Sequence, residues 1–184
     1  MNFREGIILR IASLVETALV IPDVNTQSAA DGVTFLMPNT GYVTPIRKVL
    51  TEPIETIPEE KSIPRIYVSF DGGRNDLGAQ VLITHLVEVL SIRVDVVLSK
   101  KHGIEEHGGN QIVRPITLQI ADTLSDLQKI ITVDSVKTAV TNPTAQLNNL
   151  YFGEWTLDER FRGGQEEVLN IRLDLEVENP LEAS

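Results

Sequence analysis

Apolar and polar residues alternate strictly near the end of the chain, between Glu167 and Val177. The apolar positions are Leu169, Ile171, Leu173, Leu175 and Val177, and the positions between them are Asn170, Arg172, Asp174 and Glu176. Because successive side chains of a strand point to opposite faces, the pattern predicts a strand with one apolar and one charged face. Such a strand belongs to a sheet that covers a core on one side and faces water or a partner subunit on the other.

A second long alternation occupies Val81–Leu98. In its second half, every other residue is apolar: Ile92, Val94, Val96 and Leu98. The residues that alternate with them are mostly polar: Ser91, Arg93, Asp95 and Val97. The first half is mixed, and we expect a β-bulge near Glu88–Leu90 to account for the change of phase.

Two further strands are predicted at Arg65–Phe70 and Leu150–Phe161. The sequence Asp71-Gly72-Gly73 is predicted to turn the chain after the first of them. Gly163-Gly164 is predicted to form the hairpin turn that leads into the last strand. In the predicted strand Leu150–Phe161, one face is expected to carry Tyr151, Gly153, Trp155, Leu157 and Glu159.

Two segments have apolar residues at spacings of three and four, the period of an amphipathic helix. The first extends from about Asn2 to Leu19, and its stripe consists of Phe3, Ile7, Ile8, Ile11, Leu14, Val15, Ala18 and Leu19. The second extends from about Pro115 to Thr132, with apolar residues at Ile112, Ile116, Ile120, Leu124, Leu127 and Ile131. Proline is favoured at the first helical position.

Residues 22–62 show neither the alternation of a strand nor the three-and-four spacing of a helix, apart from a short strand predicted at Ile46–Leu50 and ended by Pro53. A connection of this length is unusual in a compact domain. We interpret it as an arm that packs on a neighbour, with a flexible surface insertion as the alternative. Lys100–Gly109 is expected to be a polar loop, and Val133–Asn142 has no clear pattern.

The order of these elements predicts an α+β fold, because runs of strands with segregated helices are typical of that class. We expect a mostly antiparallel β-sheet with two α-helices packed on one face, plus a long extended arm or hairpin. The 184 residues are expected to form a single domain, residues 1–184, with the arm inserted at about 22–62.

Composition narrows the possible functions. The net charge is −10 and the pI is about 4.7, which argues against nonspecific nucleic-acid binding through a basic face. The chain has no cysteine, so disulfides and thiolate metal sites are excluded. The longest apolar stretch near the start, Gly6–Ile21, contains Arg10, Ser13, Glu16 and Thr17. We therefore expect neither a membrane span nor a signal peptide.

Candidate metal sites are weak. Asp71–Asp76 has the glycine and oxygen-ligand content of a calcium loop. However, the third, sixth and twelfth positions, where an EF-hand needs an oxygen ligand, a glycine and a glutamate, hold Gly73, Asp76 and Leu82. His102 and His107 flank Glu105 and Glu106, but the third histidine, His85, is distant in the sequence. A turn and a solvated loop are favoured over metal sites.

Catalytic signatures are also weak. The acidic residues Glu154, Asp158, Glu166 and Glu167 gather near the last hairpin. Paired carboxylates can act as general acid and base, but a solvated hairpin accounts for them more simply. We expect no catalytic residue, no cofactor and no metal.

The charged face of the two long strands offers a different kind of site. Arg93 and Asp95 on one strand, and Arg172 and Asp174 on the other, have the same Arg-x-Asp order. If the strands pair in antiparallel fashion, opposite charges are expected across from each other, worth about 0.2–1 kcal/mol per pair. The face is either solvent-exposed or an interface between the subunits of a ring. The candidate interface residues are these four with Val33, Phe35 and Met37 of the arm.

The order of elements resembles the tail terminator (tail completion) and neck proteins of long-tailed bacteriophages. The resemblance covers residues 1–20 and 63–178. It rests on the first amphipathic helix, the proline-led strand Ile63-Pro64-Arg65-Ile66-Tyr67-Val68, the alternating strand Val89–Leu98, the helix start Ile120-Ala121-Asp122-Thr123-Leu124 and the last alternating strand Leu169–Val177. It is a pattern of elements without an invariant catalytic signature.

The resemblance implies a structural virion protein that is not an enzyme. The resemblance implies a hexameric ring that caps the head-proximal end of the tail tube and ends tube polymerisation. The implied partners are sister copies, the tail tube protein and the head–tail connector proteins. DNA would pass through the lumen without specific binding, and an acidic lumen would repel its phosphates. The implied location is the virion tail or neck, and the host cytoplasm during assembly.

Three alternatives stay open at the level of sequence. One is a head–tail connector, stopper or other tail assembly protein. A second is a small cytosolic enzyme that uses the acidic cluster, which would require those carboxylates to converge in a pocket. A third is an adaptor domain that binds one protein through the arm.

Overall fold

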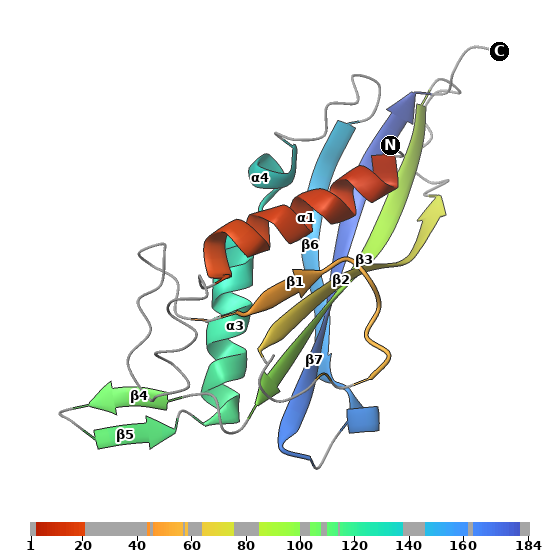
Figure 1. Ribbon diagram of the computed structural model, residues 1–184. Coiled ribbons are helices and arrows are strands. Elements are labelled where there is room, and N and C mark those ends of the chain that lie inside the picture. Colours follow the sequence, from red (N-terminus) through yellow and green to blue (C-terminus); the bar gives the residue numbers. More distant parts are fainter. Residues whose placement is uncertain are drawn as a thin grey trace.

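The computed structural model describes residues 3–20, 44, 46–56, 58, 64–75, 85–99, 104–107, 110–113, 115–137, 146–161 and 164–180. The fold is α+β, as the sequence predicts, with helices packed on one face of a five-stranded sheet (Figure 1). Most of the predicted arm, including Val33, Phe35 and Met37, lies outside the described residues, as do His102, Asp76 and Gly163.

The main sheet has the strand order β1-β2-β3-β7-β6. Its strands are β1 (Lys48–Leu50), β2 (Arg65–Asn75), β3 (His85–Ser99), β7 (Glu166–Pro180) and β6 (Gln146–Leu157). All neighbours are antiparallel except β1 and β2, which are parallel. The two longest strands, β3 and β7, pair along their whole fifteen-residue lengths and form the centre of the sheet.

The helices are α1 (Phe3–Leu19), α3 (Ile116–Ile130) and the short α4 (Val133–Lys137). The first two confirm the predicted helices, although the second begins after Pro115 rather than at it. Helix α4 accounts for part of the segment that had no clear sequence pattern. Its first turn is capped by Thr132 and Ser135, whose side chains and backbone N–H groups bond one another.

The core lies between the helices and the apolar face of the sheet. Most of its residues come from one stripe of α1, from α3 and from the alternating apolar positions of β3 and β7, and α4, β2 and β6 contribute others. They include Ile7, Ile11, Val15, Leu19, Ile120, Leu127, Ile92, Val94, Val96, Ile171, Leu173 and Leu175. Polar contacts also hold the helices in place. Arg4 of α1 forms an ion pair with the buried Glu88 of β3. The buried Asp126 of α3 accepts a 2.8 Å hydrogen bond from the backbone of Thr44.

The predicted turn at Asp71-Gly72-Gly73 is wrong, because β2 continues through these residues to Asn75. The register against β3 shifts between Phe70 and Gly72, and Gly72 has a φ of +136°, which glycine adopts readily. The predicted position of the bulge, near Glu88–Leu90, is also wrong. Strand β3 stays in continuous register with β7, and the irregularity lies on the neighbouring strand.

The predicted polar loop at Lys100–Gly109 is wrong in part. Strands β4 (Ile104–His107) and β5 (Asn110–Val113) form a separate two-stranded sheet beside the start of α3 (Figure 1). The predicted strand Leu150–Phe161 starts earlier, and its last residues, Glu159–Phe161, form a short 3-10 helix. The short strand predicted at Ile46–Leu50 is confirmed as β1.

Truncation of a buried α3 residue tests the packing of the helix on the sheet. Leu127 is fully buried, whereas Leu118 on the same helix is 46 % exposed. We expect Leu127→Ala to lower the free energy of unfolding by about 2–5 kcal/mol, because the substitution removes buried methyl groups and leaves a cavity. Leu118→Ala is the matched control, with an expected loss below about 1 kcal/mol. Equal losses in urea denaturation would contradict the placement of α3.

Candidate interface on the polar face of the sheet

On the face of the sheet opposite the helices, the described residues form a hydrophobic cover at one end. A second, smaller hydrophobic cluster there joins the segment after β1 to β2, β3 and β7 through Ile54, Tyr67, Val97 and Val168, with Leu50 and Phe161 packed against it. Beyond this cluster the same face of β3 and β7 carries Ser91, Arg93, Asp95, Arg172 and Asp174, together with the half-buried Val87 and Val89. All four charged candidates predicted in the strands are therefore brought together on one surface.

The predicted pairing of opposite charges across the two strands is wrong. Arg93 lies directly opposite Arg172, Asp95 lies opposite Asn170, and Ser91 lies opposite Asp174. The reason is geometric: two Arg-x-Asp sequences in antiparallel strands run in opposite directions, so once the arginines align, the two aspartates diverge to opposite sides of them.

Each arginine is neutralised instead by the aspartate two residues further along its own strand. Arg93 Nε donates to Asp95 Oδ1 at 2.7 Å, and Arg172 Nε donates to Asp174 Oδ1 at 2.9 Å. Ser91 links the two strands, because its hydroxyl donates to Asp174 Oδ1 at 2.6 Å and accepts from Arg172 Nη2 at 2.9 Å. Residues i and i+2 of a strand share a face, which makes these pairs possible.

The two aspartates have different electrostatic environments. Asp95 is 1 % exposed, and burial raises its pKa although the hydrogen bond and charge of Arg93 act in the opposite direction. Burial also acts to raise the pKa of Asp174, but hydrogen bonds from Ser91 and Arg172 outweigh it, so that this pKa is lowered. On this face each arginine therefore lies beside an aspartate of its own strand.

Asp158 connects the end of β6 to this network. Arg160 Nη2 lies 2.6 Å from Asp158 Oδ2, the backbone N–H of Arg160 donates to Oδ1 at 3.0 Å, and Arg93 Nη2 lies 3.5 Å from Oδ2. The Arg160 guanidinium also lies 5.1 Å above the Phe161 ring. The hydrogen bond from Arg160 is the largest influence that lowers the pKa of Asp158 to about 2.

The four acidic residues near the last hairpin do not form one site. Glu166 and Glu167 are consecutive in β7, so their side chains point to opposite faces of the sheet. Asp158 is engaged by Arg160, and Glu154 is exposed on β6. Within the parts of the chain that the structure describes, no three His, Asp or Glu side chains lie together in a way that could hold a metal ion.

The prediction that Tyr151 and Trp155 share one face of a strand is wrong. The register of β6 against β7 shifts between Phe152 and Trp155. Tyr151 therefore lies opposite Asp174 of the polar face, and Trp155 lies opposite Ile171. Both aromatic side chains are about half exposed, at 55 % and 49 %. Two large aromatic residues exposed on an edge strand are a surface feature that the alternation did not identify.

No protein-family model matches the chain, and no curated protein does. None of the helices in the described residues is long and apolar enough to cross a membrane.

The pKa of Asp158 predicts a pH-dependent contribution to stability. Since its value of about 2 lies below the reference of 3.8, the ionised group stabilises the fold above about pH 4, and the contribution is lost as the pH falls toward 2. We expect Asp158→Asn to lower the free energy of unfolding by about 1–2 kcal/mol at pH 7. In urea denaturation at several pH values, the difference from the parent protein should shrink between pH 4 and 2.

Glu154→Gln, which removes an exposed carboxylate from the same part of the chain, is the control, with an expected change within about 0.5 kcal/mol. A difference for Asp158→Asn that stays constant down to pH 2 would contradict the ion-pair assignment.

Proposed function

We propose that this protein is a structural component of a bacteriophage neck, in which copies of the chain form a hexameric ring at the head-proximal end of the tail tube. The ring ends polymerisation of the tube and presents a surface to the head–tail connector proteins. Its partners are sister copies, the tube protein and the connector, and it acts in the virion after assembly in the host cytoplasm. The proposal includes no catalytic step.

The observation that best supports the proposal is the unequal covering of the two faces of the sheet. Among the described residues, the helices α1, α3 and α4 cover one face with a continuous hydrophobic core, and the small cluster around Tyr67 and Val97 covers an end of the other. The remaining polar face carries the exposed Arg172 and Tyr151 and the half-buried Glu176 and Glu178. A sheet with one sealed face and one open polar face is well suited to line a passage or to meet a partner.

The charges of the polar face are consistent with a passage for DNA. Along β3 and β7 the arginines that point to this face, Arg93 and Arg172, are each held by an aspartate. Glu176 and Glu178 follow on the same face of β7. Binding to phosphates requires clustered cationic groups that are available to replace counterions. A surface of internal ion pairs and additional carboxylates instead lets a polyanion pass without strong attachment.

The family resemblance also supports the proposal, because the α+β fold has the helix-backed sheet and the two long strands that the resemblance implied. A fold alone does not establish a function, so the proposal depends on assembly. The interface assignment for Arg93, Asp95, Arg172 and Asp174 stays a prediction.

Ring formation is the direct test of the proposed function. We expect negative-stain electron microscopy of the purified chain to show closed rings of uniform size, and mass photometry to show one species of matching mass. A protein that stays monomeric at every concentration, including in the presence of tail tubes that lack a cap, would contradict the proposal. Rings that fail to bind the ends of such tubes would support assembly and contradict the capping role.

A further inference from the structure

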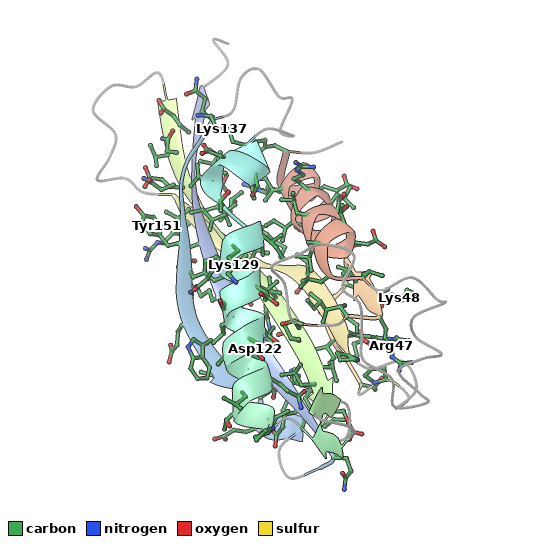
Figure 2. The ribbon with its side chains drawn as sticks, turned by 90° about the vertical axis from the view of Figure 1, so that its left-hand side faces the viewer. Arg47, Lys48, Asp122, Lys129, Lys137 and Tyr151 are labelled. Atoms are coloured by element: carbon green, nitrogen blue, oxygen red, sulfur yellow. The ribbon has the colours of Figure 1, made fainter. Side chains whose placement is uncertain are left out.

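Asp95 of β3 is an acidic residue enclosed within the polar face of the sheet. It is almost fully buried, and it lies opposite Tyr67 of β2 on one side and opposite Asn170 of β7 on the other. This face is turned away from the helices, on the side where Figure 2 shows Tyr151 of β6. Asp95 Oδ1 accepts a 2.7 Å hydrogen bond from Arg93 Nε. Since a buried carboxylate is unfavourable unless its charge is compensated, the surrounding groups decide how readily Asp95 keeps its charge.

A second carboxylate, that of Asp158, competes for the same arginine. Arg93 Nη2 lies 3.5 Å from Asp158 Oδ2, and Arg160 Nη2 lies 2.6 Å from the same oxygen. Burial raises the pKa of Asp95, the hydrogen bond and charge of Arg93 lower it, and the charge of Asp158 raises it further. The pKa of Asp158 is instead lowered to about 2. Surroundings that move the pKa values of two neighbouring carboxyl groups apart assign the first proton to one of them, which here is Asp95.

Asn170 offers an acceptor for that proton. Its side chain forms a hydrogen bond with the Asp158 carboxylate, and only its Nδ2 can donate to a carboxylate. This bond fixes the orientation of the amide. Among the described residues, the buried Asn170 Oδ1 accepts no hydrogen bond, and a buried acceptor without a donor lowers stability. Because Asn170 lies directly opposite Asp95, a protonated Asp95 would supply the missing donor.

We propose that Asp95 is a proton-uptake site, at which Oδ2 binds a proton at acidic pH and donates it in a hydrogen bond to Asn170 Oδ1. Asp95 Oδ1 keeps its hydrogen bond from Arg93, whose charge retains the ionised Asp158 as a partner. The proton removes one negative charge per chain from the polar face and adds a hydrogen bond between β3 and β7. The sheet therefore contains a pH-responsive link at its centre, and this link does not depend on formation of a ring.

Carbon-13 chemical shifts of the carboxyl groups, followed against pH, test the proton uptake directly. Asp95→Asn and Asp158→Asn assign the two resonances, because each variant lacks one of them. We expect Asp95 to titrate above the reference value of 3.8 and Asp158 to titrate below it. Titration of Asp95 at or below 3.8 would overturn the proposal.

Asn170→Leu tests the acceptor, because leucine has a shape similar to that of asparagine and no polar side-chain atom. Loss of the acceptor is expected to lower the pKa of Asp95, whereas a more apolar environment alone would raise it. Asn149→Leu is the matched control, at a residue whose side chain donates to Glu176 at 3.2 Å, and it should leave the titration of Asp95 unchanged. An unchanged or raised pKa of Asp95 in Asn170→Leu, or equal shifts in both variants, would overturn the proposed hydrogen bond.

The pH dependence of stability gives an independent measurement. Asparagine at position 95 reproduces the protonated acid, since its Oδ1 can accept from Arg93 and its Nδ2 can donate to Asn170. A carboxyl group whose pKa is raised in the native state binds more protons there than in the unfolded chain, so the parent protein gains stability as the pH falls through that window. The variant lacks this titration. We expect the urea midpoint of Asp95→Asn to exceed that of the parent at pH 7, and the excess to shrink as the pH falls toward about 3.

The direction of this change with pH is decisive. Asp158→Asn is expected to show the opposite trend, because its lower urea midpoint at pH 7 should rise toward that of the parent as the pH falls. If the midpoint of Asp95→Asn relative to the parent stays constant or rises as the pH falls, Asp95 keeps its charge in the native state. Either result would overturn the proposal.

Discussion

The register of β3 against β7 is the constraint on which the rest of this structure depends. A slip of two residues would keep every apolar side chain on the core face, and it would place Arg93 opposite Asp174 and Asp95 opposite Arg172. Coulomb attraction across the strands favours that slipped register, at about 0.2–1 kcal/mol per pair. The observed register places Arg93 opposite Arg172, so another interaction must outweigh the lost pairs.

The small cluster on the polar face supplies that interaction. In the observed register Val97 lies opposite Val168, and both are fully buried with Tyr67 and Ile54. The slip would set Val97 opposite Asn170. Burying a valine contributes about 1.5–3 kcal/mol, compared with about 0.4–2 kcal/mol for the two cross-strand ion pairs of the slipped register. The arginines also recover partners within their own strands. The resulting polar face is neutralised internally, which is the property that the proposed passage requires.

Much of the fold could be predicted from the sequence, because a period of two or of 3.6 determines which residues face the core. The stripes of α1 and α3 and the alternation of β3 and β7 were correct for this reason. Other features depend on contacts between distant segments. The pairing of Arg93 with Arg172 could not be predicted from the alternation of apolar and polar residues. A shift of two residues leaves every side chain on the same face, so the alternation is identical in the two registers. The faces of Tyr151 and Trp155 were wrong because a bulge between them shifts the parity, and Gly72 was assigned to a turn although glycine also serves β-bulges.

Cross-strand backbone nuclear Overhauser effects on the isotope-labelled protein measure this register most directly. The account predicts contacts that join Arg93 to Arg172, Asp95 to Asn170 and Val97 to Val168. Contacts that join Arg93 to Asp174 and Asp95 to Arg172 would show that cross-strand charge pairing sets the register, and would contradict the account of the polar face.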